Sequence, residues 1–213
     1  MAISTLSKLT VPLATDTSSS NQGLLMPKLK YRFRVVLQGF GANGTVPTEL
    51  TKQVQDITRP KINFEEMEIP VYNSRIYLAG RHNWESVTLN VRDDASGSIQ
   101  RLCGEQIQKQ FDFFEQASAA SGQDYKFTTL IEILDGGNGT QTPNVLETFE
   151  LYGTFVQNID YGDLNYTSNE PAMISMSLRY DNAIQYRGGG VDGIGRNIGA
   201  RTIGSLTTGG GTV

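Results

Sequence analysis

Apolar and polar residues alternate along most of the chain between residues 30 and 186. Side chains of a β-strand point to opposite faces in turn, so this two-residue period is typical of strands with one buried face. The clearest case is Tyr31, Phe33, Val35 and Leu37, which alternate with two arginines, a valine and a glutamine. Further strands are predicted at 51–57, 61–69, 71–80, 84–92, 127–135, 145–160 and 173–180.

Two of these predicted strands, 61–69 and 71–80, follow each other almost directly. Pro70 separates them, and Asn73 and Ser74 are residues that favour turns. We therefore expect a long, protruding hairpin. In the strand 145–160 we expect a bulge near Gly153, because glycine inside a strand often marks one.

One segment changes to a period of three and four residues, which is typical of an amphipathic helix. It begins after Asp93 and Asp94, and Ser96 or Ser98 is the expected N-cap. This is the only helix that the sequence predicts. Its apolar stripe comprises Ile99, Leu102, Cys103, Ile107, Phe111, Phe114 and Ala117.

Both ends of the chain differ in composition from the part between them. Residues 1–29 are rich in Ser, Thr and Ala and show no sustained period, so they predict either a floppy terminus or an arm ordered on a partner subunit. Residues 187–213 hold 10 of the 23 glycines and cannot build a core of their own. We thus expect an N-terminal arm (1–29), one β-domain (30–186) and a Gly-rich extension (187–213).

The low share of charged residues and the negative net charge of the central domain limit the kinds of molecule that the chain can bind. Charged residues make up only 19% of the chain, and such a surface suits packing against other protein. Residues 30–186 contain 13 Lys and Arg against 20 Asp and Glu, a net charge of −7. A domain with this charge should repel nucleic acid.

Residues for catalysis, metal binding or cofactor binding are scarce. A single cysteine, Cys103, and a single histidine, His82, exclude an internal disulfide and a protein-built zinc site. His82 is predicted at a turn and Cys103 on the apolar helix stripe, so neither fits a catalytic pair. We expect no enzyme activity, catalytic residue, cofactor or metal.

A glycine motif does not predict a cofactor site, and patterns for membrane insertion or secretion are missing. Gly188, Gly190 and Gly193 match the spacing of a dinucleotide-binding loop, but no acidic residue follows Gly193 at the required distance. No apolar run approaches the ~18 residues of a membrane span, and the N-terminus lacks a secretory pattern. We expect the chain to fold in the cytosol.

Acidic and aromatic groups also need an interpretation. Glu65, Glu66 and Glu68 could be paired carboxylates, but neighbouring residues of a strand face opposite sides, which favours a solvated or channel-facing stripe. The aromatic residues have spacings compatible with a core, and no basic stripe accompanies them as a single-strand binding surface would require. They are Tyr31, Phe33, Phe111, Phe113 and Phe114.

An ordered set of segments resembles the tail tube proteins of contractile-tailed (myovirus-type) bacteriophages, which are related to type VI secretion tube proteins. The set begins with an Ile-Pro-Val segment that enters the hairpin, a Leu-Ala-Gly turn at 78–80, and an alternating strand that ends in an acidic pair. It ends with a strand that closes on Asn-Ile before a Tyr/Asp-rich loop, and with a final Leu-x-Tyr-Asp. The resemblance covers about residues 30–186.

This resemblance implies a fold, an assembly and partners. The fold would be mainly β, an antiparallel β-barrel or sandwich with one amphipathic helix. Subunits would form hexameric rings with a continuous inner β-barrel, and the rings would stack into a tube in the virion, assembled in the host cytoplasm. Partners would be the chain itself and the tail sheath, baseplate and tail-terminator proteins. DNA would pass through the lumen during ejection without specific binding.

The expected contact sites lie on the hairpin. Ring-to-ring contacts are assigned to Val71, Tyr72, Asn73, Arg75, Tyr77 and Arg81, and an acidic lumen or inter-ring contact to Glu65, Glu66 and Glu68. An ordinary surface hairpin is the plainer interpretation.

Two other functions stay open. One is a tube in a type VI secretion system or another phage-derived contractile device. The other is a β-sandwich carbohydrate-binding module that uses Trp84 and exposed tyrosines as stacking platforms.

Overall fold

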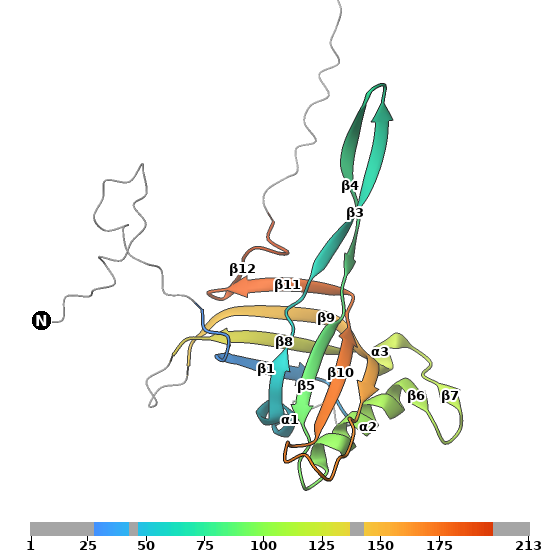
Figure 1. The fold of residues 1–213 in the computed structure, drawn as a ribbon, viewed down its shortest axis with the longest axis vertical. Coiled ribbons are helices and arrows are strands. Elements are labelled where there is room, and N and C mark those ends of the chain that lie inside the picture. Colours follow the sequence, from blue (N-terminus) through green and yellow to red (C-terminus); the bar gives the residue numbers. More distant parts are fainter. Residues whose placement is uncertain (1–27, 43–46, 137–142, 198–213) are drawn as a thin grey trace, which may run out of the picture. The chain divides into compact units, whose positions relative to one another are not determined.

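The computed structural model describes residues 28–42, 47–136 and 143–197 (Figure 1). Residues 28–32 belong to a first unit, Met1–Arg32, and the second unit is Phe33–Val213. Within the first unit, the Arg32 N–H donates to the Leu29 carbonyl, and Tyr31 is exposed. The prediction that Tyr31 belongs to a strand with a buried face is therefore wrong. Most of the predicted arm, 1–27, lies outside the described residues.

Antiparallel β-structure makes up most of the second unit. The main sheet has eight strands in the order β1-β8-β9-β10-β5-β2, with β11 paired to β9 and β12 paired to β11. Its strands are β1 (Phe33–Gln38), β2 (Val54–Ile57), β5 (Val87–Arg92), β8 (Phe127–Leu134), β9 (Val145–Asp160), β10 (Met173–Arg179), β11 (Asn182–Arg187) and β12 (Gly190–Val191).

Two separate hairpins and three helices complete the described elements. The hairpins are β3 (Ile62–Val71) with β4 (Ser74–Trp84), and β6 (Phe111–Asp112) with β7 (Ala117–Ser118). The helices are α1 (Thr48–Gln53), α2 (Ser98–Gln110) and α3 (Gly122–Tyr125). The mainly β fold with antiparallel strands is confirmed.

Strand β9 runs through both halves of the main sheet. Its first half pairs with β8 and β11, and its second half pairs with β10. The change occurs at Gly153, whose φ of +64° is easily reached only by glycine and where the register with β8 shifts. The predicted bulge near Gly153 is confirmed, and it lets one strand belong to two differently oriented parts of the sheet.

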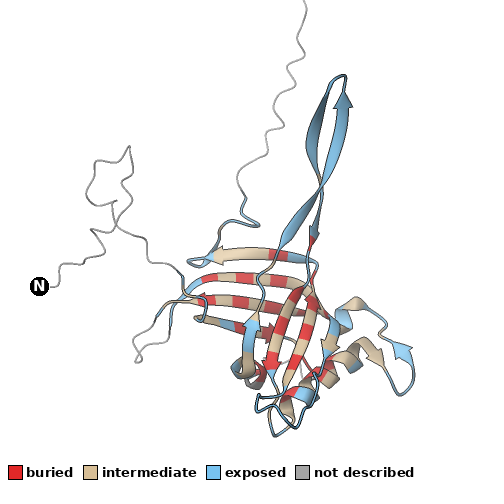
Figure 2. Ribbon diagram, viewed as in Figure 1, coloured by how far each residue is buried: buried red, intermediate tan, exposed pale blue. Residues whose placement is uncertain are grey.

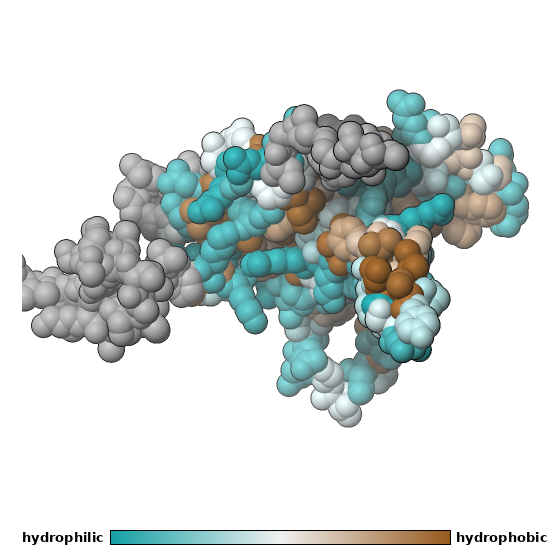
Figure 3. Space-filling model, turned by 90° about the horizontal axis from the view of Figure 1, so that it is seen from above, coloured by the Kyte–Doolittle hydropathy of each residue, from teal (hydrophilic) through white to brown (hydrophobic). Residues whose placement is uncertain are grey.

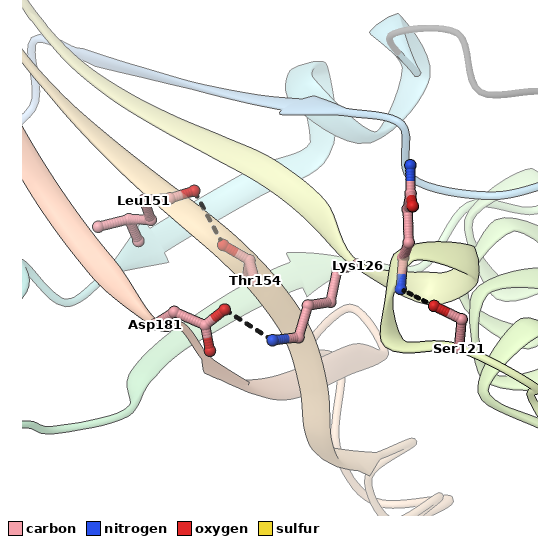
Figure 4. A network of polar contacts seen from close by, with 6 residues as sticks. Ser121, Lys126, Leu151, Thr154 and Asp181 are labelled. Carbon is pink, nitrogen blue, oxygen red and sulfur yellow. Dashed lines mark hydrogen bonds and ion pairs between the residues drawn. The ribbon is translucent and has the colours of Figure 1, made fainter.

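Polar contacts fasten this corner (Figure 4). The Lys126 ammonium binds the Asp181 carboxylate at 2.6 Å, and the Asp181 N–H donates to the Tyr152 carbonyl. The Thr154 hydroxyl donates to the Leu151 carbonyl across the bend. Close by, the Ser121 hydroxyl accepts the Gln123 N–H and caps α3. Asp181, at the junction of β10 and β11, therefore joins the bend in β9 to the end of α3.

The core lies on the inner face of the sheet, and buried residues alternate with partly exposed ones along β5, β8, β9 and β10 (Figure 2). Helix α2 contributes Ile99 and Cys103 to the same cluster as Leu89 and Met176. The Cys103 sulfur lies 3.7 Å from the Met176 sulfur, and burial raises the pKa of the thiol to about 12. The expected burial of Cys103 on the apolar stripe of the helix is confirmed.

Two glutamines of α2 satisfy backbone groups that no strand reaches. The buried Gln106 accepts the Gly41 N–H and donates to the Tyr125 carbonyl. Gln110 binds both the N–H and the carbonyl of Val156 on β9. A buried backbone group without a partner is costly. Gln110 therefore takes the place of a missing strand along β9, and Gln106 satisfies Gly41 and Tyr125 outside that strand.

Helix α2 is shorter than predicted. It ends at Gln110 because Asp112 offers the following backbone an alternative, accepting the N–H groups of Phe114 and Glu115 in a turn. Phe111 then enters β6, while Phe113 and Phe114 are exposed, so the expected core role of the last two is wrong. The predicted serine cap is also wrong, because Gly97 is the N-cap.

Three other segments differ from the prediction. Residues 51–53 belong to α1 instead of a strand, and Leu50 of this helix is buried in the core. The strand predicted at 173–180 is not the last one, since β11 follows it and pairs with β9. In the Gly-rich extension, Arg187 ends β11, and Gly190–Val191 form β12, which pairs with β11. Strands β1 and β2 lie at the ends of the sheet order, so the described chain forms no closed barrel.

The bend at Gly153 can be tested by substitution. Gly153→Ala should lower the free energy of unfolding by about 1–3 kcal/mol, because it forces a non-glycine residue into a positive φ and its Cβ would overlap the Asp181 carboxylate. Urea denaturation measures this change.

Gly104→Ala is the matched control. It lies inside α2, where an added Cβ meets no atom within 4 Å. This substitution should stabilise the protein by about 0.5–1 kcal/mol. Equal effects at the two positions would contradict the role given to Gly153.

Candidate assembly surface

The hairpin β3–β4 extends away from the main sheet and is almost entirely exposed (Figures 1 and 2). Every residue of β3 is exposed, and in β4 only Gly80 and Trp84 are not. The long protruding hairpin predicted from the sequence is confirmed. A two-stranded hairpin without further support is marginally stable in water, so a structure of this length needs a partner surface or a reason to be solvated.

One face of the outer hairpin is apolar. Residues paired across the strands share a face, and the register pairs Met67 with Leu78, Ile69 with Ile76 and Val71 with Ser74. The space-filling view from above shows a group of apolar residues (brown) bordered by hydrophilic ones (teal) (Figure 3). We call Met67, Ile69, Val71, Ile76 and Leu78 the apolar face; their exposed fractions lie between 39% and 55%.

The opposite face is charged and polar. It contains the pairs Glu66 with Ala79, Glu68 with Tyr77 and Pro70 with Arg75. The Arg75 guanidinium lies 2.9 Å from the Glu68 carboxylate, and both side chains are exposed. An exposed ion pair of this kind contributes at most about 1 kcal/mol, so it favours the hairpin but does not explain its length.

A bulge in β4 separates the outer hairpin from its base. Gly80 and Arg81 lie opposite the single residue Glu65, and the register shifts between Phe64 and Glu66. An added Cβ on Gly80 would lie 2.8 Å from the Glu65 carbonyl oxygen, so the close approach of the strands requires glycine. The Leu-Ala-Gly segment predicted as a turn is thus a bulge, and His82 lies in β4, not at a turn.

The tip of the hairpin is a two-residue turn of Tyr72 and Asn73. Tyr72 has a φ of +50° and is 99% exposed. A positive φ at the first residue of such a turn favours glycine, and a bulky residue there is strained. Nothing in the described chain contacts this ring to offset the strain. Strained residues concentrate at functional positions, which makes Tyr72 a candidate contact residue.

The base of the hairpin is anchored in the core. Trp84 is only 5% exposed and packs against Tyr180, with ring centroids 5.6 Å apart. Arg179 donates to the Asn83 side chain at 2.8 Å. Because the Trp84 ring is buried, it offers no stacking platform for a sugar, and the carbohydrate-binding alternative is left with the exposed tyrosines alone.

The hairpin brings together all residues that the sequence assigned to assembly. Tyr72 and Asn73 form the tip, and Glu65 and Arg81 meet at the bulge. Glu66, Glu68, Arg75 and Tyr77 belong to the charged face, whereas Val71 belongs to the apolar face. Sequence reasoning missed the other four residues of the apolar face. The alternation of apolar and polar residues along each strand was visible in the sequence. Only the register across the turn shows that Met67 and Ile69 share a face with Ile76 and Leu78.

Other chemistry is sparse. Among residues 28–42, 47–136 and 143–197, no group of three or more His, Cys, Asp or Glu side chains could hold a metal ion. Gly188, Gly190 and Gly193 lie in β12 and its turns instead of opening a helix. No helix in the described part of the chain is both long and apolar enough to cross a bilayer.

Comparisons with known proteins identify the fold. No family model matches the chain, and no curated protein sequence matches it. A chain in a cryo-EM structure of the anti-feeding prophage (AFP) baseplate matches with a TM-score of 0.57 and 16% identity, covering 77% of this chain and 98% of that one.

Two more solved structures match in the same way. A chain in the structure of the AFP tube terminating cap has a TM-score of 0.56 and 18% identity, covering 88% and 99% of the two chains. A chain in the sheath-tube complex of PVC, an extracellular contractile injection system, has a TM-score of 0.54 and 17% identity, covering 81% and 99%. The resemblance to proteins of contractile devices, expected from the sequence, is confirmed at the level of the fold.

The strain at the hairpin tip gives a test on the isolated protein. Tyr72→Gly should slow amide hydrogen exchange in the outer hairpin, because it removes a left-handed penalty of about 1–2 kcal/mol. Asn73→Gly is the control; Asn73 does not have a positive φ, so this change should not slow exchange. Unchanged or faster exchange in Tyr72→Gly would show that the tip is not strained.

Proposed function

We propose that this chain is the structural subunit of a tail tube, which polymerises as stacked hexameric rings inside a contractile sheath. The observation that carries the proposal is the apolar face of the hairpin, which nothing in the described chain covers. The fold shared with chains of contractile-device structures supports the same function. No enzymatic step is part of this proposal.

Burial of the apolar face would supply a useful free energy. Complete burial of a large apolar side chain is worth about 1.5–3 kcal/mol, and about half of that remains available for residues that are half exposed. The five residues together offer on the order of 5 kcal/mol before the entropy of association is subtracted. A contact of this size is weak for an isolated pair of subunits. It becomes strong when every subunit of a polymer repeats it.

Two open sheet edges support lateral contacts. Strands β1 and β2 lie at the two ends of the main sheet order. Such edges pair readily with strands of another molecule, and closing a ring removes them. Pairing between neighbouring subunits would form the continuous inner barrel that the resemblance implies.

The cargo would be DNA, which must slide without being held. One face of β5 and β10 carries short polar side chains: Thr88 pairs with Ser177, and Asn90 pairs with Ser175. Next to them Asn90 donates to the Asp56 carboxylate at 2.7 Å. The same face carries Arg92 and Arg179 at its ends, but the stretch between them holds no Lys or Arg and would release few counterions from DNA. Glu65, Glu66 and Glu68 are the further candidates for an acidic lumen.

A tube in a contractile device outside a virion is the second candidate function. It is favoured by the fold matches to AFP and PVC, since PVC is described as an extracellular contractile injection system. In both cases the partners would be sheath, baseplate and terminator proteins. Capsid genes beside the coding gene would favour a virion tube, whereas a secretion ATPase gene would favour the other device.

The apolar face can be tested by a double substitution. Ile69→Thr with Ile76→Thr keeps β-branched side chains but removes apolar surface, so it should raise the concentration needed for polymerisation by about tenfold or more. Sedimentation velocity and negative-stain electron microscopy of the full chain measure this. Thermal unfolding should change little, because both residues lie outside the core clusters.

Glu115→Gln, an exposed position in the turn between β6 and β7, is the control and should polymerise like the unmodified chain. Hollow tubes formed equally well by the double variant would contradict the proposed use of the apolar face. A full chain that forms no ring or tube at any concentration, even with its baseplate components, would contradict the tube function itself.

A further inference from the structure

The bend at Gly153 divides the main sheet into two halves, and each half has two outer strands. In the half that contains β8, these are β1 and β11; in the half that contains β5, they are the second part of β9 and β2. A free edge presents unpaired N–H and C=O groups and pairs readily with a strand of another molecule. Whether each edge is covered therefore decides where a second copy of this chain can add.

The chain itself covers two of these four edges. Along the second part of β9, the Gln110 side chain binds the N–H and the carbonyl of Val156. Along β11 lies the segment 188–197, which we call the strap; its strand β12 is seen beside β11 in Figure 1. In the described part of the chain, β1 and β2 have no partner strand on their outer sides.

Backbone hydrogen bonds hold the strap on β11. The Gln185 N–H donates to the Ile194 carbonyl, and the Gln185 carbonyl accepts the Asp192 N–H, both at 2.9 Å. Closer to the turn, Arg187 pairs with Gly190. The strap thus provides β11 with the partners that a further strand would provide.

The start of β11 is closed by a side chain. Residues two apart on a strand direct their backbone groups to the same side, so Ala183 faces the same edge as Gln185. Its N–H donates to the Asn182 side chain at 2.9 Å. The outer edge of β11 is therefore covered from Ala183 to Arg187.

Glycines allow the strap to approach β11 closely. Gly193 and Gly195 have φ values of +85° and +91°, which favour glycine. An added Cβ would overlap the Gln185 side chain at Gly193 and would lie 2.9 Å from an Ile184 methyl at Gly195. The Gly-rich composition of the extension, which cannot build a core, thus has a specific use on this edge.

Stabilising the core does not explain the strap. Its apolar residues Val191 and Ile194 are exposed, and neither belongs to a core cluster. The ion pair between Arg196 and Asp192 is also exposed and contributes little. A segment that buries so little apolar surface adds little to stability. Covering an edge strand, in contrast, is a known way to prevent unwanted pairing between molecules.

We propose that the strap guards the β11 edge of the free subunit against strand addition by a second copy of this chain. With the β9 and β11 edges covered, pairing between copies is confined to β1 and β2. Pairing at a third edge would produce irregular aggregates instead of closed rings. This inference goes beyond the proposed tube function, because it concerns the free subunit and holds whether or not tubes form.

Substitution of the two strap glycines tests the guard in the full-length chain. Gly193→Val with Gly195→Val places β-branched residues at positive φ against β11, which should release the strap. Amide hydrogen exchange at Gln185 should become at least about tenfold faster. Self-association, followed by light scattering at a fixed concentration, should also become at least about tenfold faster.

Gly190→Val is the matched control. Gly190 lies in the strap but has no positive φ, and an added Cβ there meets no atom within 4 Å. This variant should exchange and associate like the unmodified chain.

A second pair of variants breaks the strap at another point. Asp192→Pro removes the N–H that the Gln185 carbonyl accepts, whereas Asp192→Asn keeps it. The proline variant should associate like the double valine variant, and the asparagine variant like the unmodified chain. Thermal unfolding of every monomer should stay close to that of the unmodified chain, because the strap contributes no residue to the core clusters.

Four results would overturn the guard. The first two are unchanged Gln185 exchange in both strap variants, and faster exchange without faster association. The third is association into ordered hollow tubes, which would make the strap a brake on regular assembly. The fourth is loss of cooperative unfolding, which would make the strap part of the fold itself. A failure of the unmodified chain to form tubes would contradict the tube function alone and leave this inference standing.

Discussion

The bend of β9 at Gly153 is the constraint on which the arrangement of the other elements depends. It allows one strand to pair with β8 and β11 on one side of the bend and with β10 on the other. The core, the position of α2 and the direction of β5 all follow from this bend. Because β5 is paired with β10, the same bend fixes which end of the domain carries the hairpin and which carries the loop 161–172.

The hairpin is the part of the structure on which the proposed assembly rests. Its base is tied to the core through Trp84, while its outer half places apolar side chains on one face and charges on the other. A protein that acted alone would gain nothing from an exposed apolar face and a strained tyrosine at its tip. Both features would have a physical reason if a neighbouring copy covered them, and repeating that contact would build the proposed tube.

Much of this fold could be predicted from the sequence, and the failures have specific causes. The alternation at Val35 and Leu37 and the glycine at position 153 identified strands and a bulge because these signals are local. Helix α2 was predicted too long because Phe111 and Phe114 continue its apolar spacing, whereas the side chain of Asp112 ends it. Helix α1 has too few residues for a period to appear; burial of Leu50 against the core determines it. The apolar face depends on the register between two strands, which no single segment encodes.

The most direct test of the account is a cryo-EM reconstruction of the polymer formed by the full-length chain. We expect a hollow tube of stacked rings in which the side chains of Met67, Ile69, Ile76 and Leu78 are buried against a neighbouring subunit. A filament without a channel, or a tube in which the hairpin extends into solvent without contacting another copy, would contradict it.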